Sequence, residues 1–133
     1  MAKRAIDTNV LVRLLVDDHS EHAVLAASLA ARFQLIVLPS VILETEWVLR
    51  SRYRVGRSLV VELLRRIIDF DEFIVIDRPR VTLALDAFET GMDFADAMHV
   101  SFTADGEIFV TFDRDLVRLA QKHIEHASIE LAS

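Results

Sequence analysis

The chain lacks cysteine, and it has only three glycines and two prolines in 133 residues. The absence of cysteine excludes disulfides and thiolate metal sites, and it fits a reducing compartment. So few glycines and prolines leave no stretch that resembles a linker or a low-complexity tail. Because this length is typical of one domain, we expect a single domain over residues 1–133.

Long hydrophobic runs are absent too. The longest apolar stretch, residues 35–43, is short and is interrupted by Pro39 and Ser40, so we expect no membrane-spanning helix. The first residues also lack the apolar core of a signal peptide. These two absences predict a cytoplasmic protein without a membrane partner.

Positive charge is in deficit, because 15 basic residues face 21 acidic ones and the formal net charge is −6. This balance argues against nonspecific binding of polyanions. However, Arg50, Arg52, Arg54 and Arg57 fall close together, and arginine suits bidentate contacts with phosphate or carboxylate. The stretch is therefore a candidate contact surface. The alternative is a solvated helix end that the helix dipole favours.

Short apolar segments alternate with segments of helical periodicity, and 53% of the residues are hydrophobic. The pattern predicts an α/β fold with a parallel sheet that helices cover on both faces. Ser20, Ser40 and Asp93 are expected to begin helices. The predicted strands are residues 4–6, 35–38, 73–76, 108–111 and 129–131, and the predicted helices are residues 10–15, 20–33, 41–53, 58–68, 79–91, 93–105 and 114–123.

Four acids recur at comparable places in this layout. Asp7 and Asp113 each follow an apolar strand directly, Glu44 lies in the helix after the second strand, and Asp96 lies in a first helical turn. Ligand chemistry in open α/β sheets collects beyond the carboxyl ends of the strands. If the strands before Asp7 and Asp113 are neighbours, the two side chains share one cleft.

Each acid also has a purely structural interpretation. Thr8 and Asn9 are common N-cap residues, and an acid such as Asp7 or Asp115 suits the start of a helix. Asp93 can be an N-cap whose partner acid three residues later mimics a capping box.

The glutamates and one histidine are similarly ambiguous. Glu44 can lie on a solvent-exposed helix face, although Leu43 and Trp47 flank it, whereas Glu46 can point outward. His99, one turn beyond Asp96, is either a ligand or an ordinary helix histidine.

A convergence of carboxylates is costly without a cation. Two like charges about 4 Å apart repel by about 4 kcal/mol at an effective dielectric near 20. Oxygen ligands without cysteine match the hard cations Mg²⁺ and Mn²⁺. Such an ion would offset the repulsion, activate water and stabilise charge on a phosphoryl group.

Together, the four segments that hold these acids resemble the acidic motifs of PIN-domain ribonucleases, and the size and motif order resemble the VapC toxins of toxin–antitoxin pairs. Asp7, Glu44, Asp96 and Asp113 match the four acid positions, and Thr8 matches the hydroxyl beside the first acid. The segments are Ile-Asp-Thr-Asn-Val-Leu at 6–11, Glu-Thr-Glu-Trp-Val-Leu at 44–49, Phe-Ala-Asp-Ala-Met-His at 94–99 and Thr-Phe-Asp-Arg-Asp-Leu at 111–116, with Asn9, Asp93 and Asp115 as supporting neighbours.

This resemblance implies a three-layer α/β/α sandwich with a mostly parallel sheet, and a Mg²⁺- or Mn²⁺-dependent endoribonuclease that hydrolyses RNA phosphodiester bonds. It further implies a homodimer held inactive by a cognate antitoxin protein. Under this interpretation the arginine stretch at 50–57 contacts RNA or the antitoxin.

Two other functions remain open. Asp7 and Asn9 loosely match the Asp-x-Asp of dehalogenase-like phosphatases, but that chemistry needs a lysine from a late strand end, and the only lysines are Lys3 and Lys122. The other possibility is a non-catalytic module of the same fold that only binds a partner.

Overall fold

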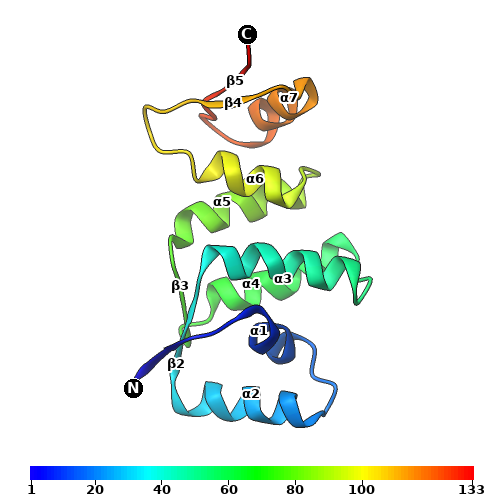
Figure 1. Ribbon diagram of the computed structural model, residues 1–133, viewed down its shortest axis with the longest axis vertical. Coiled ribbons are helices and arrows are strands. Elements are labelled where there is room, and N and C mark those ends of the chain that lie inside the picture. The colour runs from blue at the N-terminus through cyan, green and yellow to red at the C-terminus, as the bar shows by residue number, and fades with distance from the viewer. The chain divides into compact units, whose positions relative to one another are not determined.

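Strands and helices alternate along the chain in the computed structural model, which describes all residues from 1 to 133 (Figure 1). The chain divides into two units: unit 1 is Met1–Asp77 and unit 2 is Arg78–Ser133. Each unit has its own parallel sheet and its own helices. None of the seven helices combines the length and the apolarity that crossing a lipid bilayer requires.

Unit 1 is built on a three-stranded sheet. β2 lies in the middle and pairs in parallel with β1 and with β3. The carboxyl ends of the three strands therefore lie at one edge, and α1 and α3 begin there. The elements are β1 (Lys3–Ala5), α1 (Thr8–Leu15), α2 (Glu21–Arg32), β2 (Gln34–Val37), α3 (Pro39–Ser51), α4 (Arg57–Asp69) and β3 (Phe73–Val75).

The core of unit 1 follows from apolar faces on its helices and from its central strand. Leu35 and Val37 of β2 are buried, as the middle of a parallel sheet requires. On α3 the buried positions follow a helical stripe. This stripe is formed by Val41, Ile42, Thr45, Val48 and Leu49.

Unit 2 combines a helix pair with a two-stranded parallel sheet. α5 and α6 pack together, and the rings of Phe88 and Phe94 meet edge to face at 5.3 Å. α7 connects the paired strands, and it buries Leu116 and Ala120. The elements are α5 (Arg78–Glu89), α6 (Phe94–Ser101), β4 (Phe109–Thr111), α7 (Arg114–His123) and β5 (Ile129–Leu131).

Most expected elements are confirmed, including the Ser20 N-cap, whose Oγ accepts a hydrogen bond from the Ala23 N–H at 3.2 Å. The expected Ser40 cap is wrong. α3 begins at Pro39 after Leu38, without a side-chain cap, because proline is preorganised for the first helical position. Thr8 and Asn9 do not cap α1 either, since that position belongs to Asp7.

The expected end of α6 near residue 105 is also wrong, because the helix ends at Ser101. Arg80 of α5 explains the early end. Its Nη1 donates hydrogen bonds to the carbonyl oxygens of Ser101 at 2.8 Å and Thr103 at 3.0 Å. These carbonyls are thus satisfied by a side chain from another helix, and continuation of α6 is not needed to pair them.

One buried hydroxyl has no partner in this arrangement and generates a prediction. Thr45 of α3 is fully buried, and its Oγ1 makes no hydrogen bond. We expect Thr45→Val to raise the free energy of unfolding by about 1 kcal/mol, because the cost of an unpaired buried hydroxyl is removed. Thermal denaturation followed by circular dichroism measures this change.

Thr82→Val is the matched control, because the Thr82 hydroxyl donates to the Arg78 carbonyl at 2.9 Å. It should lower the melting temperature. A Thr45→Val protein that melts below wild type would contradict the prediction.

Candidate active site

Asp7 follows β1 and is the N-cap of α1. Its Oδ1 accepts a hydrogen bond from the Val10 N–H at 3.1 Å. The side chain is exposed, and the capping bond uses only one of its two oxygens. Asp7 is therefore structural through one oxygen, while the other is available to a ligand.

Thr8 links the first acid to the second. Its buried hydroxyl donates a hydrogen bond to Oε1 of Glu44, and this bond joins α1 to α3. Glu44 itself is exposed. Unit 1 therefore brings Asp7, Thr8 and Glu44 to the region where α1 and α3 leave the sheet.

Glu46 corrects the expectation about the two glutamates of α3. It is only 2% exposed, and its Oε2 accepts a hydrogen bond from Arg50 Nε at 2.7 Å. The helical stripe could have revealed this position, because Glu46 lies four residues after the buried Ile42 and three before the buried Leu49.

Asp93 and Asp113 are also N-caps, of α6 and α7. Asp93 Oδ2 accepts from the Asp96 N–H at 3.0 Å. Asp113 Oδ1 accepts from the N–H groups of Asp115 at 2.9 Å and Leu116 at 3.1 Å. As at Asp7, one oxygen of each carboxylate holds the helix start.

The acids of unit 2 influence one another. Burial raises the pKa of the Asp96 carboxyl above its ordinary value of 3.8, and the negative charges of Asp93 and Asp113 raise it further, against an opposing effect of His99. The three carboxylates are therefore close enough to repel in the absence of a cation.

Asp115 and His99 both contact neighbouring side chains of the fold. Asp115 lies in the first turn of α7, as expected of an acid at a helix start. It also pairs with Arg118 at 3.5 Å. The exposed His99 ring stacks on Phe109 with a centroid separation of 6.3 Å.

We expected the first and fourth strands to be neighbours, but they do not form hydrogen-bonded pairs with each other. β1 pairs with β2, and β4 pairs with β5. The acids are thus divided between the units, with Asp7 and Glu44 in unit 1 and Asp96 and Asp113 in unit 2. No group of three or more acidic or histidine side chains is arranged to hold a metal ion.

The four arginines of residues 50–57 do not share one environment. Arg50 pairs with Glu46, whereas Arg52 lines a cavity of about 600 Å³ in unit 1 to which Asp7 and Asn9 also contribute. Arg54 is exposed at a positive φ of 54°, and Arg57 begins α4. Only Arg52 of this stretch therefore lines the same cavity as a predicted site residue.

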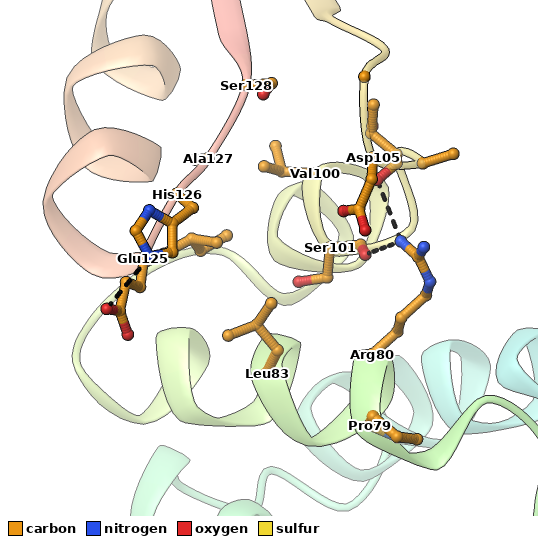
Figure 2. Close-up of a pocket in the computed structure, with 14 residues that line it drawn as sticks. Pro79, Arg80, Leu83, Val100, Ser101, Asp105, Glu125, His126, Ala127 and Ser128 are labelled. Atoms are coloured by element: carbon orange, nitrogen blue, oxygen red, sulfur yellow. Dashed lines mark hydrogen bonds and ion pairs between the residues drawn. The ribbon is translucent and has the colours of Figure 1, made fainter.

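Another cavity, of about 490 Å³, lies within unit 2 and contains none of the predicted site residues. Figure 2 shows Arg80 and Ser101 at its wall, with the Ser101 side chain directed toward Leu83. The Ser101 hydroxyl is buried without a hydrogen-bond partner. A bound water can satisfy such a group.

Comparison with known proteins identifies the family. A family model described as PIN domain matches residues 5–122 of the chain. The chain belongs to the PIN domain family. A comparison with curated proteins gives no match.

The PIN match spans both units and all four acid motifs. It confirms the predicted fold class, because seven helices and parallel strands in this family agree with a three-layer α/β/α fold. PIN domains are generally nucleases and usually bind divalent metal ions.

The raised pKa of Asp96 has a consequence for stability. Above its ordinary pKa of 3.8 the folded protein retains a proton that the unfolded chain has lost, so the stability of the metal-free protein should fall as pH rises through the raised pKa. Asp96→Asn should melt higher than wild type at neutral pH in EDTA, and it should flatten this part of the pH profile.

Melting curves of both proteins in EDTA, from acidic to neutral pH, check this sign. If Asp96 serves mainly as a favourable charge at the helix start, the mutant will instead melt lower than wild type at neutral pH.

Proposed function

We propose that this PIN domain is a Mg²⁺- or Mn²⁺-dependent endoribonuclease that hydrolyses RNA phosphodiester bonds in the cytoplasm. We further propose that it is the toxin of a toxin–antitoxin pair, acts as a homodimer and is inhibited by its cognate antitoxin. Asp7, Glu44, Asp96 and Asp113 would form the catalytic set.

The observation that carries the proposal is that none of these carboxylates forms an ion pair with lysine or arginine. Neither lysine nor arginine forms an ion pair with any of the four, and Asp93 has none either. By contrast, the buried Glu46 pairs with Arg50, and Asp18 pairs with Arg13 at 2.7 Å. In unit 2, Asp96 lies close to Asp93 and Asp113, and acids that lack such ion pairs beside other acids are suited to a divalent cation.

The donor set fits a hard divalent cation, because it consists of carboxylate oxygens and lacks sulfur. A bound Mg²⁺ or Mn²⁺ lowers the pKa of water and stabilises charge on a phosphoryl group.

The chain's own residues have distinct tasks in this proposal. Asp7 and Asp113 would use the oxygen that their helices leave free to bind the ion. The Thr8 hydroxyl fixes the orientation of Glu44, and such support of a ligand commonly matters for affinity and activity. Burial and, after it, the negative charge of Asp93 raise the pKa of Asp96, so a cation would be favoured beside this pair.

The toxin assignment is supported by the size of the chain and by the order of its four acid motifs, which resemble VapC toxins. It names a protein partner as well as an RNA. Asn9 would be a supporting neighbour of the ligands, whereas Asp115 pairs with Arg118 and should matter less. Arg52 is the arginine of residues 50–57 that lies beside Asp7.

Asp7→Asn tests the catalytic assignment. We expect the variant to fold and to lose at least about 100-fold in cleavage rate, because even groups that only support metal ligands are worth about 10- to 100-fold. Cleavage of a labelled single-stranded RNA in Mn²⁺ is the measurement, with circular dichroism to check the fold.

Asp115→Asn is the matched control and should keep most of the activity, since Asp115 pairs with Arg118. An Asp7→Asn protein with turnover near that of wild type would show that the site is misassigned. A wild-type protein that binds RNA but never cleaves it would favour a non-catalytic module.

Metal binding can be tested without any reaction. Mn²⁺ should raise the melting temperature of wild type above its value in EDTA, because a ligand of the native state stabilises it by about 2.7 kcal/mol at a hundred times its dissociation constant. Asp113→Asn should show a smaller shift and Asp115→Asn an undiminished one. A wild-type melting temperature that is indifferent to Mn²⁺ would refute the proposed metal site.

A further inference from the structure

A cavity opens beside the candidate catalytic Asp7, and its lining comes from α1, α2 and the residue that follows α3. Its volume is about 600 Å³, which is within the range of roughly 300–1,000 Å³ that small-molecule pockets have. Every lining residue belongs to unit 1.

The charged side chains of this cavity are mostly basic. Arg13, His22 and Arg52 line it, whereas Asp7 is the only acid that does. Arg13 is held by Asp18 at 2.7 Å, but neither Arg52 nor His22 has an ion pair or a side-chain hydrogen bond. In a chain of net charge −6, this is a local surface suited to an anion.

The rest of the lining is largely aliphatic. Val10, Leu25 and Leu29 contribute to it, and Leu25 is 56% exposed. An apolar surface beside unpaired basic groups matches a nucleotide, which has apolar base faces and an anionic phosphate.

We propose that this cavity binds one nucleotide of a single-stranded RNA next to the bond that is cleaved. The base packs against Val10, Leu25 and Leu29, and a neighbouring phosphate pairs with Arg52. Arg52 is thus a positioning residue that holds the RNA for Asp7 and does not take part in the reaction itself. This inference rests on the proposed ribonuclease function.

The observations favour RNA over a protein segment as the occupant. Asp7 lines the same cavity, so an RNA phosphate bound at Asp7 would lie at its edge. Unpaired bases that a protein can contact through their faces are typical of single-stranded RNA recognition.

Binding measured without cleavage tests the inference. The dissociation constant of a short fluorescein-labelled single-stranded RNA is determined by anisotropy in EDTA, over a range of salt concentrations. Arg52→Gln should raise this constant several-fold and make the slope of log affinity against log salt shallower by about 0.7, the value of one phosphate contact on a single strand. Arg52→Lys should restore the slope, because it keeps the charge.

Arg66→Gln is the matched control for charge. Arg66 is an exposed arginine of unit 1 that pairs with Glu62 and does not line the cavity. Replacing Arg66 with Gln should leave the RNA affinity and its salt dependence nearly unchanged.

A second pair of variants tests the aliphatic wall. Leu25→Glu places a negative charge in the cavity, whereas Val24→Glu places the same charge on the adjacent exposed residue of α2. We expect Leu25→Glu alone to weaken RNA binding strongly and to raise KM for cleavage in Mn²⁺. Circular dichroism shows whether both proteins are folded.

The outcomes separate this inference from the proposed function. If wild type cleaves RNA while the cavity variants bind it as their controls do, the cavity serves another ligand, such as a protein segment, and the inference is overturned. If wild type neither binds nor cleaves RNA, the proposed function fails and takes the inference with it. Loss of affinity and a shallower salt slope confined to the cavity variants would support it.

Discussion

The structure depends on acids that cap helices with only one of their two carboxylate oxygens. Asp7, Asp93 and Asp113 each begin a helix, and each uses one oxygen to accept backbone N–H groups. The positive end of a helix dipole is a favourable place for a carboxylate, so each of these acids suits the helix start that it caps. The structural and the functional interpretations of these residues are therefore compatible, because the helix leaves the second oxygen available.

The sequence predicted local structure well where a local signal exists. The periodicity of α7 and the apolar segment of β5 predicted both elements with their observed ends. The errors arose where distant groups decide. Arg80 of α5 binds the carbonyl of Ser101, the last residue of α6, and the residues around Arg80 and Ser101 in sequence do not indicate that contact. At α3, proline geometry outweighed the capping preference of Ser40.

The candidate site was predictable to a similar degree. Acids that follow strands can be recognised from the order of residues alone, and the family match covers the segments that hold them. The link from Thr8 to Glu44 and the cavity that Arg52 lines join residues from separate helices, so no spacing rule reveals them. Burial of Glu46 was predictable in principle, but only from the full stripe of α3 and not from the residues beside it.

The two ends of α6 are each held by a side chain, Asp93 at the start and Arg80 at the finish. The helix between them has eight residues, and each residue turns the helix by about 100° and advances it by about 1.5 Å. Inserting or deleting one residue between Asp93 and Asp96 would therefore swing the Asp96 carboxylate away from Asp93, even if every side chain were retained.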